Sequence, residues 1–74
     1  MAIYSANRPN RTVTLHKDNC RRIPRDNLEA CGCGETGERG NQQWFCEDHL
    51  HIEDIDQFMN GRQWALLLCE TCYS

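Results

Sequence analysis

Three short stretches of the chain have the apolar and β-branched pattern of strands. Residues 12–15 (TVTL) alternate in character and place His16 at their end. Residues 42–46 (QQWFC) form a second such stretch, and a continuous apolar run over residues 63–68 leads into Cys69. The pattern therefore predicts three strands, each of which ends at a cysteine or histidine.

Between the second and third strands the apolar period changes to that of a helix. Apolar side chains recur at three- and four-residue spacing, which is the stripe of an amphipathic helix. We predict one helix over about residues 51–60, ended by Gly61. The stripe and the aromatic residues Trp44, Phe45 and Trp64 are expected to form the core. It consists of Ile52, Ile55, Phe58 and Met59.

The remaining segments show neither the alternation of a strand nor the three- and four-residue spacing of a helix. Residues 1–10 have no periodic pattern and are predicted to be a flexible basic tail, which leaves residues 11–74 as a single zinc-binding domain. Residues 26–30 suit one capped helical turn. Residues 31–40 hold four of the five glycines and are predicted to form only a loop around their cysteines.

Length and cysteine content change this picture of an ordinary small domain. The chain has 74 residues, six of them cysteine and three histidine. A chain this short buries only about 60% of its unfolded surface and needs a source of stability besides its core. We therefore predict a small α+β zinc-stabilised domain, with short strands and one amphipathic helix.

Charge divides the chain into two parts. The formal net charge is −3, and residues 1–25 carry +5 while residues 26–74 carry −8. This balance does not favour general nucleic-acid binding, which depends on neutralising phosphates, but it leaves a local basic arm as an alternative. The arm would consist of Arg8, Arg11, Lys17, Arg21, Arg22 and Arg25.

The cysteines and histidines fall into four close pairs. Zinc takes four nitrogen or sulfur ligands, and a short spacer lets one turn direct two side chains at one ion. Four pairs therefore make two Cys3His sites that use every cysteine, with His51 as an alternate to His49. The pairs are His16-x3-Cys20, Cys31-x-Cys33, Cys46-x2-His49 and Cys69-x2-Cys72.

The four pairs can combine in two ways. In a nested arrangement the first pair joins the last, and the two middle pairs close a local site across 19 residues, which keeps loop closure inexpensive. In a cross-braced arrangement the first pair joins the third and the second joins the fourth. We favour the nested arrangement, although spacing alone excludes neither. Closed sites of this kind are structural, because a catalytic zinc keeps a position open for water.

Two partial resemblances follow from these motifs. The order strand, His16-x3-Cys20-Arg21, helix and Cys69-x2-Cys72 resembles the small metal-binding domain at the N-terminus of the Ada DNA-repair protein. That family uses four cysteines, one of which accepts a methyl group; His16 stands at the first position here, so methyl acceptance is not expected. Residues 31–58 are similar to a treble-clef finger, although the Cys-x-Cys spacer is shorter than usual. These resemblances imply a zinc-binding fold and no particular substrate.

Other uses of the cysteines are weaker alternatives. Three disulfides would allow fifteen pairings, but no secretory signal is recognised, so we expect a reducing, cytoplasmic location. A thioredoxin-like role for Cys69-x2-Cys72 would require a helix start with more chain after it than Tyr73 and Ser74. A nucleophile formed by Cys46 and a histidine would lack a recognisable oxyanion site.

The sequence thus predicts a protein without enzymatic activity that holds two structural Zn²⁺ ions. We expect a small regulatory or adaptor module that binds a larger protein, of the type found as accessory proteins of bacteria or phages. The acidic part of the chain motivates a protein partner. The alternatives are a zinc-dependent nucleic-acid-binding module that uses the basic residues, and a thiol redox protein.

Overall fold

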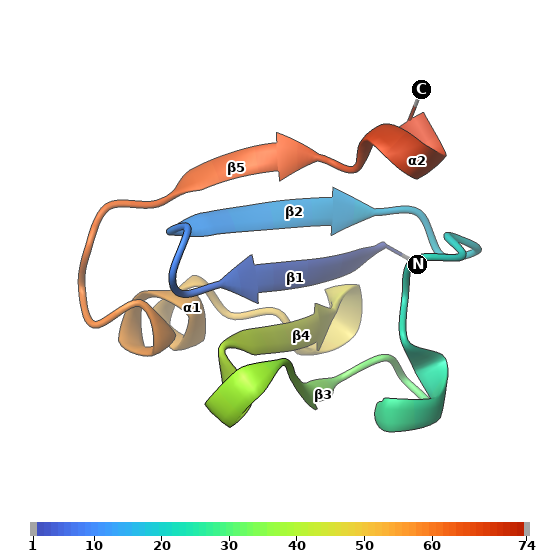
Figure 1. Cartoon of the computed structure of the whole chain (residues 1–74), viewed down its shortest axis with the longest axis horizontal. Coiled ribbons are helices and arrows are strands. Elements are labelled where there is room, and N and C mark those ends of the chain that lie inside the picture. The colour runs from blue at the N-terminus through green and yellow to red at the C-terminus, as the bar shows by residue number, and fades with distance from the viewer. Residues whose placement is uncertain (1, 74) are drawn as a thin grey trace.

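The fold is a five-stranded sheet with short helices at its ends and on one face (Figure 1). The computed structural model describes residues 2–73. The α+β class predicted from the sequence is confirmed. The strands are β1 (Ile3–Asn7), β2 (Thr12–His16), β3 (Gly34–Thr36), β4 (Gln42–Cys46) and β5 (Ala65–Leu68). The helices are α1 (Ile52–Phe58), α2 (Glu70–Tyr73) and the 3-10 turns η1 (Arg25–Asn27), η2 (Glu38–Gly40) and η3 (Glu47–His49).

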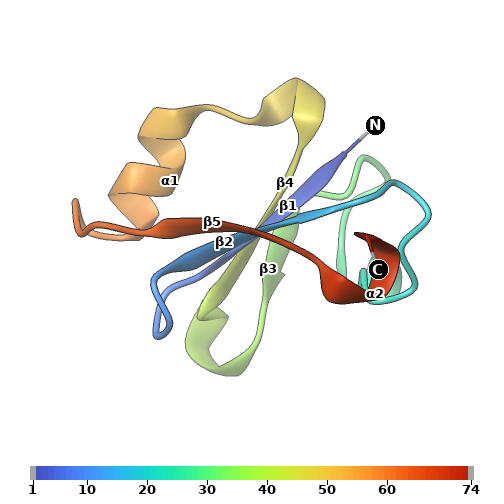
Figure 2. The ribbon, with the colours of Figure 1, turned by 90° about the horizontal axis from the view of Figure 1, so that it is seen from above.

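The strand order in the sheet is β3-β4-β1-β2-β5. Strand β1 pairs antiparallel with both β2 and β4, and β3 pairs antiparallel with β4. Strand β5 pairs parallel with β2. The segment that contains α1 connects β4 to β5 across one face, and it returns the chain to the opposite edge of the sheet (Figures 1 and 2).

Strand β1 is the middle strand of the sheet, so the prediction of a flexible tail over residues 1–10 is wrong for the segment Ile3–Asn7, while Met1 lies outside the described residues. Ile3, Ser5 and Ala6 are all buried in β1. A central strand is covered on both faces and therefore does not show the alternation that marks a half-exposed strand. The segment also contains the small residues Ser5 and Ala6, so its composition resembles that of a loop.

The glycine-rich segment also contains more structure than predicted. Residues 34–36 form β3, an edge strand that pairs with β4. The predicted strands at residues 12–15, 42–46 and 63–68 correspond to β2, β4 and β5. The predicted helix corresponds to α1, after which Gly61 adopts a positive φ of 72°.

Two clusters of buried side chains pack on opposite faces of the sheet. One cluster lies under α1, where the predicted stripe contributes Ile55 and Met59 to the core while Ile52 stays 53% exposed. The other cluster lies on the opposite face and contains Ile3, Ile23, Trp44 and three buried cysteines, and the remaining three cysteines pack against it. Within residues 2–73, no helix has the length and apolar character that a membrane crossing requires.

Candidate metal centres

The cysteines and histidines gather at one end of the sheet. Strand β2 ends on His16, β4 ends on Cys46, and Cys69 directly follows β5. These three strands run in the same direction, so their ends meet at the same side of the molecule (Figure 1). We call the two resulting sets the outer group and the inner group. The outer group is His16, Cys20, Cys69 and Cys72; the inner group is Cys31, Cys33, Cys46 and His49.

The grouping is that of the nested arrangement and differs from the cross-braced one. Within each group the candidate ligand atoms all lie within 4.8 Å of one another. All eight residues singled out by spacing belong to one of the two groups. His51, the alternate to His49, belongs to neither and stands exposed at the start of α1.

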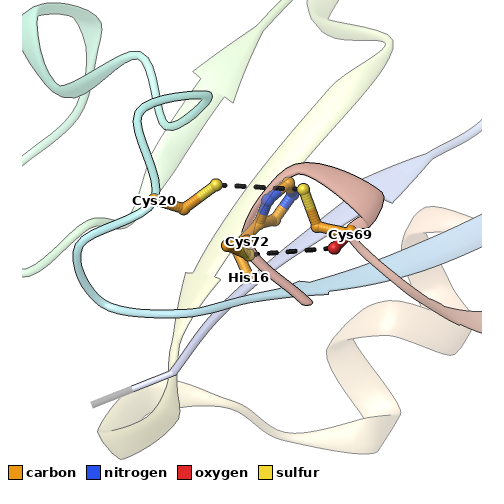
Figure 3. A group of neighbouring side chains, drawn as sticks. All are labelled: His16, Cys20, Cys69 and Cys72. Carbon is orange, nitrogen blue, oxygen red and sulfur yellow. Dashed lines mark hydrogen bonds between the residues drawn. The ribbon is translucent and has the colours of Figure 1, made fainter. Parts of the chain in front are cut away.

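The outer group draws its four side chains from three segments of the chain, and they point toward one another (Figure 3). The sulfurs of Cys20 and Cys69 are 3.8 Å apart. Two thiolates on one tetrahedral zinc, each about 2.3 Å from the ion, are separated by about 3.8 Å. The backbone N–H of Lys17 donates to the sulfur of Cys72 at 3.3 Å, an interaction that stabilises a thiolate. The arrangement therefore fits a tetrahedral metal ion.

The inner group is assembled from the glycine-rich segment and the end of β4. The sulfurs of Cys33 and Cys46 are 3.5 Å apart, and Cys33 Sγ lies 3.7 Å from His49 Nδ1. The Cys46 sulfur approaches the same nitrogen to 2.8 Å. The backbone N–H of Cys46 donates to Cys33 Sγ at 3.4 Å. The turn η3 directly after β4 brings His49 back over the cysteines.

His16 supplies the most specific indication of a ligand. Its side chain is buried, and its Nε2 is 3.1 Å from the hydroxyl oxygen of Ser5. Its Nδ1 is buried without a hydrogen-bond partner in the part of the chain that the structure describes. Buried polar atoms are nearly always satisfied, so an unpaired nitrogen beside three sulfurs is suited to a metal ion.

Ser5 is a site residue that the sequence analysis missed. If the Ser5 hydroxyl accepts a hydrogen bond from Nε2–H, it fixes the ring so that Nδ1 faces the sulfurs, the usual way in which a ligating histidine is oriented. Ser5 is opposite Thr14 on one neighbouring strand and Trp44 on the other. Nothing in the sequence connects it with a histidine eleven residues away.

The pKa values of these groups differ because burial and hydrogen bonding act unequally on them. Burial, together with the charge of Arg22, lowers the pKa of His16 and favours the neutral imidazole that a metal requires. Burial raises the pKa of Cys20 and raises that of Cys33 to about 12. For Cys69 burial acts in the same direction, but hydrogen bonds from backbone N–H groups and neighbouring thiols outweigh it and lower the pKa to about 7.

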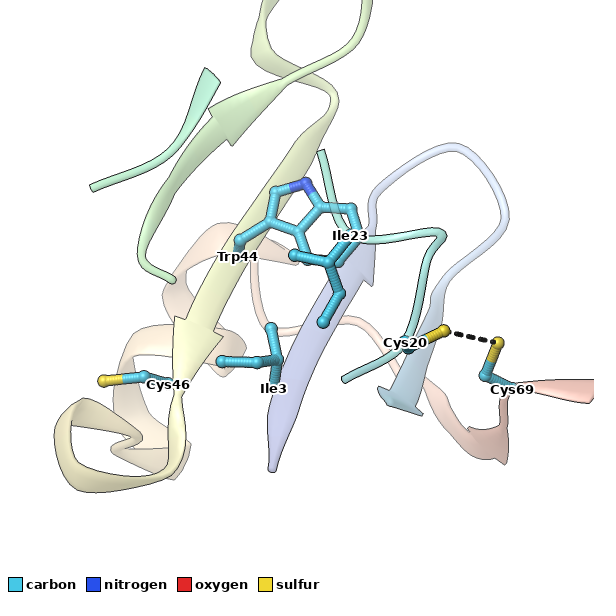
Figure 4. Close-up of a cluster of buried hydrophobic side chains, with 6 residues drawn as sticks. All are labelled: Ile3, Cys20, Ile23, Trp44, Cys46 and Cys69. Carbon is cyan, nitrogen blue, oxygen red and sulfur yellow. Dashed lines mark hydrogen bonds between the residues drawn. The ribbon is translucent and has the colours of Figure 1, made fainter. Parts of the chain in front are cut away.

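The two groups share one hydrophobic cluster and are separated by a single strand. Ile3 on β1 is opposite His16 of the outer group and Cys46 of the inner group. Adjacent strands lie about 4.8 Å apart, so the backbones of the two groups come within about 10 Å. Figure 4 shows Ile3 below Trp44, with Cys46 to one side and the outer cysteines to the other. Each group therefore packs against the same apolar residues.

The predicted basic arm is divided between the two ends of the sheet. Arg8 and Arg11 lie in the turn between β1 and β2, whereas residues 21–25 follow the other end of β2. Arg8 stacks on the Phe58 ring at 4.3 Å and donates to the Phe58 carbonyl. Several of these cations thus have partners within the molecule, and they do not form one continuous surface. The others with such contacts are Lys17, over the Tyr73 ring, and Arg25, paired with Asp18.

No protein family, curated protein or solved structure matches this chain. The likeness to the Ada metal-binding domain and to treble-clef fingers therefore rests on the ligand spacing and stays a prediction.

Changing Ser5 to alanine is expected to weaken metal binding at the outer group about tenfold while leaving the inner group unchanged. The variant removes the hydrogen bond to His16 but retains all four ligands, and loss of such outer contacts typically costs 10- to 100-fold in affinity. Competition titration with a zinc chelator measures both affinities. The same change at Ser74, outside the ligand set, serves as the control. Equal affinities in S5A and the unaltered protein would contradict this role for Ser5.

Proposed function

We propose that each group binds one Zn²⁺ ion, giving two Cys3His sites per chain. The observation that carries this proposal is the partition of all six cysteines and two histidines into two sets of four converging ligand atoms. Three sulfurs and one nitrogen in a tetrahedral arrangement are the donor set that zinc prefers. The unpaired Nδ1 of His16 supports the same assignment.

We propose further that both ions are structural and that the protein has no enzymatic activity. Four protein ligands fill a tetrahedral zinc and leave no position for a substrate or an activated water. With all six cysteines engaged, none remains as a free nucleophile or redox thiol. The use of free cysteines as ligands agrees with a reducing compartment such as the cytoplasm.

The role that we propose for this zinc-stabilised domain is that of a small regulatory or adaptor protein that binds a larger protein. An acidic surface on η3 and α1 supports this role, because its carboxylates precede and follow the exposed residue Ile52 along the chain. Carboxylates around an apolar contact suit a basic protein surface. We call this the acidic surface. It consists of Glu47, Asp48, Glu53, Asp54 and Asp56.

Nucleic-acid binding, the alternative drawn from the sequence, has less support. The six basic residues are split between two ends of the sheet, and three of them contact aromatic or acidic side chains of the same chain. A phosphate backbone would meet no continuous basic stripe. A thiol redox role has less support still, because it needs a cysteine outside the two groups.

A matched pair of charge variants tests the proposed partner surface. The zinc-loaded protein is immobilised, and the proteins it retains from extracts of the cells that express it are quantified by mass spectrometry. We expect a retained protein whose recovery falls at least about tenfold with the double change E53K/D54K, because reversing two charges removes attraction and adds repulsion. The double change E35K/E38K alters the net charge equally on β3 and η2, and it should leave recovery unchanged.

Three results would count against this function. Recovery that is equal for the two double variants would exclude the acidic surface as the contact. A set of retained proteins identical to that of an unrelated acidic protein of similar size would exclude a specific partner. Recovery of nucleic acid that falls with R21E/R22E would favour the alternative.

A further inference from the structure

Strand β5 exposes large apolar side chains at an edge of the sheet. The exposed fractions of Leu66, Leu67 and Leu68 are 59%, 48% and 58%. From the register, Leu66 lies on the α1 face beside Val13, and Leu67 lies on the opposite face beside Thr14. Apolar surface therefore continues over both faces of the edge. A protein resting on one face would contact only half of it, whereas a strand that extends the sheet would place its side chains beside the leucines on both faces.

The backbone of β5 is also available for pairing on its outer side. The Ala65 N–H donates to the carbonyl of Arg11, just before β2, and the Cys69 N–H donates to the carbonyl of Leu15 in β2. Hydrogen-bonding direction alternates along a strand, so the N–H and C=O groups of Leu66 and Leu68 face away from β2. No strand lies beyond β5 among residues 2–73, and Figure 2, which looks down on this edge, shows it crossing the molecule uncovered.

The opposite edge of the sheet is built differently. Strand β3 has only three residues, Gly34–Thr36, and its middle residue is an exposed glutamate. Short length and charge are the features that keep edge strands from pairing. Strand β5 has no charged residue among its four. The contrast singles out β5 as the edge that is suited to a partner strand.

The charges at the two ends of β5 indicate which strand this partner is. Exposed Arg62 precedes the strand and exposed Glu70 follows it. In an antiparallel pair centred on Leu66, Arg62 of one chain approaches Glu70 of a second copy, and the reciprocal pair forms by symmetry. Leu66 then meets its own counterpart on the two-fold axis, with its outward N–H and C=O groups exchanging hydrogen bonds. In this register Leu67 lies opposite Ala65 of the second copy and Leu68 lies opposite its Trp64. A second copy thus supplies apolar partners on both faces and complementary charge at both ends.

We propose that β5 is a self-association edge, through which two copies pair antiparallel to form one continuous ten-stranded sheet. The pairing is isologous and therefore closes at a dimer. It uses a surface separate from the acidic surface on η3 and α1, so each dimer presents two copies of the proposed partner-binding face. The inference does not depend on the identity of that partner.

Sedimentation velocity of the zinc-loaded protein over a range of concentrations tests the proposal. We expect a dimer of twice the 8.6 kDa chain mass, and a dissociation constant that rises at least about tenfold in the Leu66→Lys variant. Ile52→Lys is the matched control, because Ile52 is similarly exposed but lies on α1, and this variant should dimerise normally. Zinc content and circular dichroism of each variant report separately on folding and on the metal sites.

Charge reversal supplies a second test that does not alter the leucines. Arg62→Glu should weaken the dimer, and Arg62→Glu combined with Glu70→Arg should restore it, because the reciprocal pairs are re-formed with opposite sign. A zinc-loaded chain that stays monomeric up to about 1 mM would overturn the proposal and assign the edge to a different protein. A dimer that withstands Leu66→Lys, or that is broken equally by Ile52→Lys, would place the interface elsewhere.

Discussion

Removal of zinc is expected to unfold this protein almost completely. Structural zinc contributes an apparent binding free energy of about 10–16 kcal/mol per site in small zinc domains, which exceeds the total stability of most domains. The outer and inner groups both pack against the cluster around Ile3 and Trp44, so loss of the ions leaves clustered buried thiols in place of bound ligands. Two small clusters of buried side chains cannot compensate for this loss.

The unfolding can be followed through Trp44. Its ring centroid lies 5.3 Å from that of His16, so its fluorescence reports on the outer group directly. Chelator titration should produce a red shift of this fluorescence together with loss of the circular-dichroism signal, and excess zinc should reverse both. Native mass spectrometry should show two zinc ions per chain before chelation. The Trp64→Phe variant leaves Trp44 as the only tryptophan and serves as the reporter protein.

An alkylating reagent completes the chelation experiment. All six cysteines should be unreactive in the zinc-loaded protein and reactive after chelation, because a zinc-bound thiolate inside a closed site is protected. An intact spectrum after the loss of all metal would contradict a structural role for zinc. A cysteine that reacts while both ions are bound would instead support the thiol redox alternative.

Replacing a buried cysteine by serine is expected to have the next largest effect. Cys46→Ser in the inner group and Cys69→Ser in the outer group should each destabilise the protein by at least about 3 kcal/mol and reduce the zinc content from two ions to one. Both sulfurs are buried, so no other group can take their place. Denaturant unfolding and native mass spectrometry measure the two effects.

The two variants should differ in where they loosen the fold. Cys69 connects β5 and α2 to the end of β2, so Cys69→Ser should increase hydrogen exchange in β5. Cys46→Ser should increase exchange in β3 instead, because the inner group holds the glycine-rich segment. His51→Gln is the control and should change stability by less than about 0.5 kcal/mol, since His51 lies outside both groups. The same exchange pattern in both variants would contradict two separate sites.

Several parts of this fold follow from local sequence. The β-branched run before His16, the strand that ends on Cys46 and the amphipathic stripe of α1 are patterns of neighbouring residues, and the structure contains all three elements. The eight candidate ligands were also recognisable, because paired spacers are a local property that one turn can satisfy. The overall α+β class was predictable for the same reason.

Other features depended on contacts between distant residues. Strand β1 looked like an unstructured tail, because a strand buried on both faces has no alternation and because the burial of Ser5 is explained only by its contact with His16. Strand β3 lies in a glycine-rich segment, and no local pattern in the sequence predicts its pairing with β4. The exposure of β5 could not be predicted from the sequence either, because an apolar run of its length more often forms a buried strand.

The sequence by itself determined which residues are candidates to bind metal, and the tertiary structure decided how they combine. The two ligands of each pair are separated by only a few residues, so each pair can be recognised in the sequence. The choice between nested and cross-braced grouping depends on which strand ends meet, and this is set by the strand order β3-β4-β1-β2-β5. The parallel pairing of β2 with β5 brings His16 beside Cys69, and the insertion of β1 between β2 and β4 keeps Cys46 on the other side of Ile3.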